Sequence, residues 1–153
     1  MSEFTAALVV SPFDNGKTWA IYKEFSYHVG ELDSGGDVIV VPVGFETDFA
    51  SVPWGFRFLI PRWGKYGKAA VIHDYLYSTQ EYGDKKHRRR RADEIFREAM
   101  EVLDVAGWRR FLMFRAVRVA GWRTWNKNAR RIAVGISKIL PLPEKATDVR
   151  QWG

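Results

Sequence analysis

The hydrophobic pattern of this chain changes its period once, and this change constrains the fold more than any other feature. From Trp19 to Tyr27, mostly apolar residues stand at every second position, which is the spacing of a strand with one buried face. From Lys68 onward, apolar residues recur every three or four positions instead, as they do on one face of a helix. The pattern predicts an α+β fold, with a small antiparallel β-sheet in the amino-terminal half followed by three or four helices.

Short segments around the 19–27 strand complete the expected sheet. Ala6–Val10 is an apolar run, and Val38–Val43 is a mostly β-branched run of the kind found in buried strands. Asp14–Gly16 and Ser34–Asp37 carry the residue types of tight turns. Gly44–Gly67 is rich in Pro, Gly, Phe and Trp, so we expect a loop that packs against the core.

The second half of the chain contains the segments expected as helices. Residues 68–77 predict a short helix, and the apolar spacing of residues 92–103 predicts a second one that ends before Gly107. A strongly basic third helix is expected over residues 111–125, and residues 132–140 are the candidate for a fourth.

The 153 residues of the chain are enough for one domain. We expect a single α+β domain over residues 1–143 and a polar tail over residues 144–153. The absence of cysteine excludes disulfides, thiolate metal sites and cysteine nucleophiles. No apolar stretch reaches the ~18 residues of a membrane span, and the amino terminus lacks the basic start of a secretory signal. We therefore expect no transmembrane segment.

Positive charge is concentrated in the carboxyl-terminal half. The net charge is +6, and residues 107–140 contain nine Arg or Lys and no Asp or Glu. Arg88–Arg91 adds a second basic run. Such a surface attracts the phosphates of nucleic acid or anionic lipid, or an acidic protein; a solvated helix face is the plainer alternative. Aromatic residues make up 15% of the chain, enough to fill a core and leave rings for an interface.

His73 and Asp74 form the first candidate for chemistry. They follow the small residues Ala69 and Ala70, which let a ligand or another backbone approach closely. Tyr77 stands four positions after His73 and so shares its helical face. The sequence has no nucleophile elbow, no phosphate-binding glycine loop and no zinc-type histidine spacing. Water activated by a histidine is the hydrolytic scheme that remains.

Asp93 is the second candidate. In the following helix it falls at the edge of the apolar stripe, where an unpaired carboxylate costs several kcal/mol to bury. We expect His73 on the neighbouring helix to be its partner. Asp93 then accepts a hydrogen bond from one imidazole nitrogen and leaves the other free to take a proton. A structural ion pair between two packed helices explains the same residues without catalysis.

Asp48 is the third candidate, just after the last expected strand. Most loop aspartates cap a turn, here by accepting from the backbone amides of Ala50 or Ser51. The alternative is a calcium site in which Asp48, nearby carbonyl groups and Asp74 supply the oxygen ligands. Calcium is accordingly the candidate cofactor, and the residues do not fix the identity of the metal.

Three ordered motifs, residues 47–53 (TDFASVP), 73–77 (HDYLY) and 92–96 (ADEIF), resemble an uncharacterised family of bacteriophage and prophage proteins. The resemblance covers about Val38 to Trp122. It implies a phage context, often among virion and tail genes, and supplies no activity. We therefore expect a virion protein, made in the host cytoplasm and associated with the tail. Its aromatic and basic surfaces would bind other virion or tail proteins; anionic lipid is a further candidate partner, and nucleic acid is less favoured.

The helix pair also resembles that of the small prokaryotic phospholipases A2. The matching pattern is His73-Asp74-x-x-Tyr77 with Asp93 standing 20 positions after the histidine. The resemblance implies that His73 is the base that activates a water molecule. It further implies that Asp93 orients His73 and that Tyr77 hydrogen-bonds Asp93.

The same resemblance implies a calcium site in which Asp74 is one ligand and Asp48, with the carbonyl of Phe49, supplies others. The chain departs from that family because it has no cysteine for the family's disulfides and because its amino-terminal half is rich in β-structure. The alternative function is accordingly a calcium-dependent, phospholipase A2-like hydrolase that acts on the cell envelope. In such an enzyme, Asp93→Asn is expected to lower the rate by orders of magnitude with the fold intact.

Overall fold

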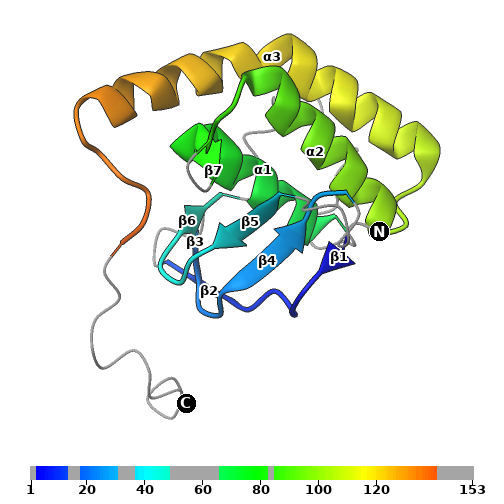
Figure 1. Cartoon of the computed structure of the whole chain (residues 1–153), viewed down its shortest axis with the longest axis horizontal. Helices are drawn as coiled ribbons and strands as arrows, with labels where there is room; N and C mark the ends of the chain where they lie inside the picture. Colours follow the sequence, from blue (N-terminus) through cyan, green and yellow to red (C-terminus); the bar gives the residue numbers. More distant parts are fainter. Residues whose placement is uncertain (1–2, 14–17, 31–36, 49–65, 83–84, 141–153) are drawn as a thin grey trace.

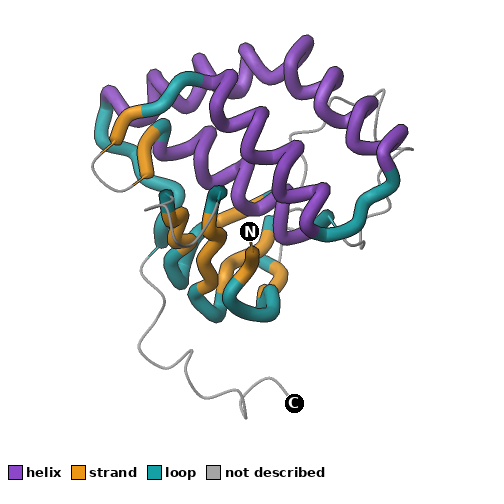
Figure 2. The backbone as a smooth tube through the Cα atoms, turned by 45° about the vertical axis from the view of Figure 1, so that its right-hand side comes forward, coloured by secondary structure: helices purple, strands orange, loops and turns teal. Residues whose placement is uncertain are grey.

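The computed structural model describes residues 3–13, 18–30, 37–48, 66–82 and 85–140. Two groups of three strands come from residues 3–47, and the helices come from residues 67–133. The strands form one layer and the helices lie together on the other side of the molecule (Figures 1 and 2). The α+β class predicted from the change of hydrophobic period is therefore confirmed.

Two small antiparallel sheets, not one, make up the strand layer. The first has the order β1-β4-β5, formed by Glu3–Phe4, Phe25–His28 and Val38–Val41. The second has the order β2-β3-β6, formed by Val10–Pro12, Trp19–Ile21 and Glu46–Thr47. A separate hairpin, β7 (Glu81–Tyr82) with β8 (Lys85–Lys86), connects the first two helices.

The prediction of one continuous strand from Trp19 to Tyr27 is wrong. The segment is divided between β3 and β4, which belong to different sheets. Lys23 explains the division, because in a continuous strand it would share one face with Ile21 and Phe25. Ile21 and Phe25 are both buried in the core, and Lys23, between the two strands, is exposed. The break thus keeps a charged side chain in water while both apolar neighbours enter the core.

Strand β5 is buried on one face only, contrary to the prediction that the whole 38–43 segment is buried. Ile39 and Val41 are fully buried, whereas Val38 and Val40 are each about two fifths exposed. β5 stands at the end of its sheet, and its inner face contacts the first helix. A β-branched run therefore does not distinguish a strand covered on both faces from an edge strand covered on one.

Three helices form the other layer: α1 (Gly67–Thr79), α2 (Arg89–Val102) and α3 (Gly107–Ala133). α1 ends where Gln80 adopts a left-handed conformation and its N–H donates to the carbonyl of Leu76 at 2.9 Å. α3 has 27 residues and extends beyond the predicted 111–125 at both ends. Within the described ranges, none of these helices offers the length and apolar surface that crossing a bilayer requires.

The fourth helix suggested for residues 132–140 does not form. α3 stops at Ala133, and Gly135 adopts a left-handed φ of 75°, which glycine reaches without steric cost. The chain then runs beside β6: the N–H of Glu46 donates to the carbonyl of Lys138, and the N–H of Leu140 donates to that of Gly44, each at 2.9 Å. Apolar spacing alone does not reveal this reversal.

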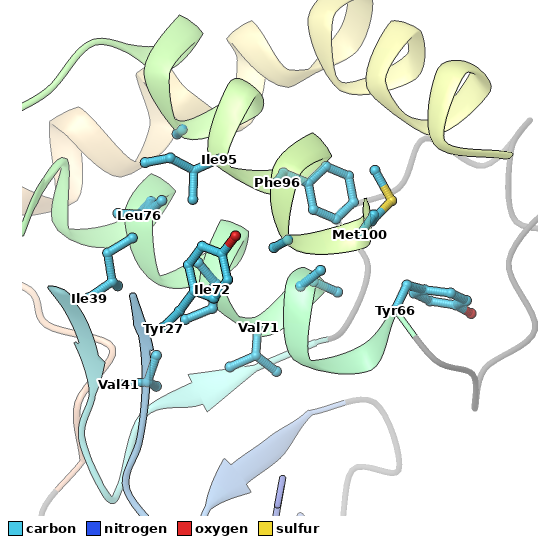
Figure 3. Close-up of a cluster of buried hydrophobic side chains, with 14 of the residues drawn as sticks. Tyr27, Ile39, Val41, Tyr66, Val71, Ile72, Leu76, Ile95, Phe96 and Met100 are labelled. Carbon is cyan, nitrogen blue, oxygen red and sulfur yellow. The ribbon is translucent and has the colours of Figure 1, made fainter. Parts of the chain in front are cut away.

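Helix α1 is the central element, because it packs on β5 and β6 and also on α2 and α3. The core lies where these elements meet, as Figure 3 shows. Its main side chains come from the first sheet, α1 and α2: Tyr27, Ile39, Val41, Val71, Ile72, Leu76, Ile95, Phe96 and Met100. Each fully buried aliphatic side chain contributes about 1.5–3 kcal/mol relative to exposure, so α1 is held firmly from both sides.

Several predicted features lie outside the described residues. They are the turn at Asp14–Gly16, most of the turn at Ser34–Asp37, most of the loop at Gly44–Gly67 with Phe49 and the proposed amide donors of Ala50 and Ser51, and the tail at 144–153. β2 and β3 pair antiparallel on either side of residues 14–17, and the N–H of Phe13 donates to the carbonyl of Thr18 at 2.9 Å. The division into a domain at 1–143 and a tail stays a prediction.

Candidate active site

His73, Tyr77 and Asp93 meet at the contact between α1 and α2. The four-residue spacing places His73 and Tyr77 on one face of α1, toward α2. His73 Nε2 lies 2.9 Å from Asp93 Oδ1, and the hydroxyl of Tyr77 donates to the same oxygen at 2.6 Å. The structure thus brings together the three residues that the sequence singled out as catalytic, in the contacts expected of them.

Asp93 is held by more groups than the sequence suggested. Its carboxylate is 0% exposed. Oδ2 accepts a hydrogen bond from Arg118 Nη1 of α3 at 2.7 Å, and Arg89 Nη1 lies 3.6 Å from the same oxygen. Burial alone raises the pKa of Asp93, but the hydrogen bonds from His73, Tyr77 and Arg118 outweigh it and hold the pKa below its usual value. The carboxylate is therefore ionised at neutral pH.

The ionised carboxylate fixes the tautomer of His73. A carboxylate oxygen only accepts hydrogen bonds, so Nε2 must carry a hydrogen, and in the neutral imidazole the lone pair is then on Nδ1. No described residue hydrogen-bonds to Nδ1. The ring is held between Tyr77 and Phe96, with centroid distances of 4.2 and 4.7 Å. These contacts fix the orientation of the His73 ring, and 9% of the residue's surface is exposed.

Helix α3 completes the support of Tyr77. A Cβ atom added at Gly121 would overlap the phenol oxygen of Tyr77, so only glycine lets α3 approach this closely. The side-chain amide of Asn128 donates to the carbonyl of Tyr77 at 3.1 Å, and Trp125 packs edge-on against its ring at 5.2 Å. Burial and the hydrogen bond to Asp93 raise the pKa of Tyr77 far above its usual value, so Tyr77 stays a donor.

Asp74 points away from this cluster, toward the second sheet. The hydroxyl of Thr47 in β6 donates to Asp74 Oδ2 at 2.7 Å. Burial, and then the charge and hydrogen bonding of Asp48, raise the pKa of Asp74 to about 8, against the opposing effect of Lys138. The structure therefore places Asp48 and Asp74 next to each other, as the calcium hypothesis requires.

This carboxyl pair fits calcium by the type of its donors. Two carboxyl groups and a threonine hydroxyl are the hard oxygen ligands that calcium prefers. Among the described residues, however, no group of three or more His, Cys, Asp or Glu is placed to hold a metal ion. Backbone carbonyls and water would have to complete the coordination, and Phe49, the predicted carbonyl ligand, lies outside the described residues.

The sequence alone did not identify Arg89, Arg118 and Gly121, which surround Asp93 and Tyr77. It also did not identify the contact of Thr47 with Asp74. Arg89 precedes Asp93 by four positions, a helical spacing that could have indicated the ion pair, and Thr47 directly precedes Asp48. Arg118 and Gly121 gave no local signal. They belong to the site only because α3 crosses α1 and α2.

Comparison with known proteins gives one match. The family model described as "Protein of unknown function (DUF1353)" matches residues 19–117, which include His73, Asp74 and Asp93 but stop one residue before Arg118. No curated protein and no solved structure matches the chain.

Proposed function

The chain belongs to the DUF1353 family of proteins of unknown function, and from its own side chains we propose that it hydrolyses carboxylic esters, with phospholipids of the cell envelope as the substrate class. The observation that carries the proposal is the 2.9 Å contact between His73 Nε2 and Asp93 Oδ1. It holds the hydrogen on Nε2 and leaves Nδ1 available to a water molecule. The resemblance of the helix pair to phospholipases A2 supports the choice of substrate.

In the proposed reaction, His73 Nδ1 takes a proton from water as the water oxygen attacks the ester carbonyl carbon. The tetrahedral adduct then collapses, the bond from that carbon to the alkoxy oxygen breaks, and His73 returns its proton to the leaving oxygen. Asp93 stabilises the positive imidazolium between these steps, and Tyr77 and Arg118 hold Asp93 in place. General base catalysis of this kind contributes about 10²–10⁴-fold to a rate.

Asp74 and Asp48 are the residues that would hold a calcium ion. A bound calcium would supply positive charge that stabilises the developing oxyanion. Without it, the chain's own contribution is to keep the two carboxyl groups adjacent, one of them on Asp74, which directly follows His73 in the sequence.

The decisive experiment is fatty-acid release from phospholipid vesicles in millimolar calcium by the full chain and its His73→Gln variant. We expect the wild-type protein to release fatty acid, chelation of calcium to stop it, and the variant to be at least ~100-fold slower. His28→Gln, a histidine change in β4, is the matched control and should leave the rate unchanged. Equal rates for wild type and His73→Gln, or no release by the wild type, would overturn the proposal.

A second candidate is a structural virion protein, associated with the tail and bound to other virion proteins. Two observations favour it: His73 is only 9% exposed, and Asp93 joins three helices as a structural ion-pair network does. The motif resemblance to phage proteins supports the same context. Calcium titration by calorimetry, run beside Asp74→Asn, separates the candidates. No calcium binding together with no hydrolysis would leave the structural function, whereas binding that the variant abolishes favours the enzyme.

A further inference from the structure

The outer face of α3 carries large apolar side chains that nothing in the described structure covers. Trp108, Phe111, Val119 and Trp122 are 57%, 61%, 71% and 50% exposed. Their spacing places all four within about 80° around the helix axis, so they form one stripe. α3 runs along the outside of the helical layer (Figures 1 and 2). Exposed apolar residues that gather in one stripe mark an interaction surface.

Cations accompany this stripe along its length. The guanidinium of Arg109 lies over the Trp108 ring at 5.1 Å, and that of Arg123 over the Trp122 ring at 5.4 Å. Near the end of α3 an open hollow of about 490 Å³ is lined by Trp122 and Val134 together with four cationic side chains, Arg123, Lys127, Arg130 and Arg131. The segment from residue 107 to 140 has no acidic residue to neutralise them. The surface thus combines an apolar stripe, in which Arg115 is an exposed cation between Phe111 and Val119, with further positive charge beside it.

Charge and composition together select the partner. A second copy of this face would bring positive charges against positive charges, which disfavours self-association. Nucleic acid would satisfy the cations, but its phosphates would leave the exposed apolar residues, Val119 above all, in water. An anionic bilayer satisfies both, because aromatic and aliphatic side chains enter the headgroup region while Arg and Lys contact lipid phosphates.

We propose that the outer face of α3 docks this protein on bilayers that contain anionic phospholipid. The proposal does not depend on the proposed hydrolysis, since it holds for a protein that turns over nothing. Phe111 and Val119 lie at the centre of the contact, and the cations of the hollow bind phosphate groups beside them.

The test is flotation of the full chain with vesicles of phosphatidylglycerol and phosphatidylcholine, compared with vesicles of phosphatidylcholine alone. His73→Gln serves as the background, so that hydrolysis does not alter the vesicles. We expect binding to the anionic vesicles, at least tenfold weaker binding to the neutral ones, and loss of binding at high salt. A second arm measures binding to duplex and single-stranded oligonucleotides.

The variant Phe111→Gln/Val119→Gln removes apolar surface while keeping a residue compatible with a helix. We expect it to bind anionic vesicles at least tenfold more weakly. The matched control is Val38→Gln/Val40→Gln, which also replaces two exposed apolar residues by glutamine, here in β5, and it should bind as the background protein does. Circular dichroism verifies that both variants are folded.

Three results would overturn the proposal: no binding to anionic vesicles, equal loss in both double variants, or tighter binding to oligonucleotides than to vesicles. Failure of the hydrolase proposal has a different signature, because the protein would then bind anionic vesicles and release no fatty acid.

Discussion

Asp93 accepts hydrogen bonds from His73, Tyr77 and Arg118 while it is fully buried. One carboxylate therefore orients the candidate base and also neutralises two arginines that approach it. Removing one partner of a buried charge network leaves the others uncompensated, which costs far more than the network contributes as a whole. At the scale of single residues, a change at Asp93 therefore affects both the orientation of His73 and the stability of the fold.

Asp93→Asn should therefore change both rate and stability, in contrast to the expectation from sequence that the fold stays intact. The amide is neutral and leaves Arg118 and Arg89 without a counter-charge, so we expect the free energy of unfolding to fall by about 3–5 kcal/mol. The hydrolytic rate should fall by about 10²–10⁴-fold. Urea denaturation and fatty-acid release measure the two effects.

The pH dependence of stability provides the control for this prediction. The pKa of Asp93 is lowered by folding, so its contribution is present above the unfolded-state pKa and disappears as the pH falls through the folded-state value. The stability difference between wild type and Asp93→Asn should therefore narrow below about pH 4. A variant as stable as wild type at pH 7 would contradict the network described here.

At the scale of elements, the site depends on how closely α3 approaches α1. Gly121 permits this approach at the phenol of Tyr77, and two side-chain amides hold the pair: Gln80 donates to the carbonyl of Trp125 at 2.9 Å and Asn128 to that of Tyr77 at 3.1 Å. The same approach brings Arg118 to Asp93. α3 thus supports the site with one face, and its opposite face carries the exposed apolar residues that we propose to dock on membranes.

Gly121→Ala should push α3 away from α1. The new methyl group would overlap the Tyr77 phenol, and overpacking of this kind costs about 1–3 kcal/mol. Gly107→Ala, whose added Cβ meets only Arg110 at 3.8 Å, is the matched control and should change stability by less than about 0.5 kcal/mol. Chemical denaturation compares the two. If Gly121→Ala and Gly107→Ala were equally stable, Tyr77 would move aside freely, and the close approach of α3 to α1 would not contribute to stability.

At the scale of the whole molecule, the contacts of Asp93 and those of Asp74 together connect the three helices with the second sheet. Asp74 of α1 meets Thr47 of β6, while Asp48 and Lys138 affect its charge from the two chain segments that run side by side there. A buried carboxyl group beside a second, half-buried one is unfavourable in its ionised form at neutral pH unless a proton or a cation lies between the two. This strain is a whole-fold property, because no single element contains both carboxyl groups.

Asp74→Asn should stabilise the metal-free protein at pH 8. The pKa of Asp74 is raised by folding to about 8, so its contribution to stability is largest at low pH and is lost as the pH rises toward that value. Asparagine imitates the protonated acid and removes this loss. Thermal unfolding in a chelator should give the variant the higher Tm at pH 8 and a smaller advantage at pH 5.

If Asp48 and Asp74 bind calcium, adding it should give the wild type a higher Tm than Asp74→Asn. Millimolar calcium is then expected to raise the Tm of the wild type and to leave that of Asp74→Asn unchanged. A variant less stable than wild type at pH 8 in the chelator would show that the carboxyl pair is not strained.

The sequence by itself determined the fold class and most of the proposed catalytic cluster. Helical spacing places His73 and Tyr77 on one face, and the position of Asp93 at the edge of an apolar stripe requires a buried partner, so these contacts follow from local rules. For Asp48 the sequence left two alternatives, a turn cap or a site shared with Asp74, and only the second predicts that the two residues are adjacent.

Only the tertiary structure decided where strands and helices begin and end and which elements contact each other. It divided the 19–27 segment between two sheets so that Lys23 reaches water, turned residues 134–140 back beside β6, and brought Arg118 and Gly121 of α3 to Asp93 and Tyr77. Each outcome depends on contacts between residues far apart in the chain. Local periodicity specifies which face of an element is apolar, whereas the free energy of burying that face depends on which other element covers it.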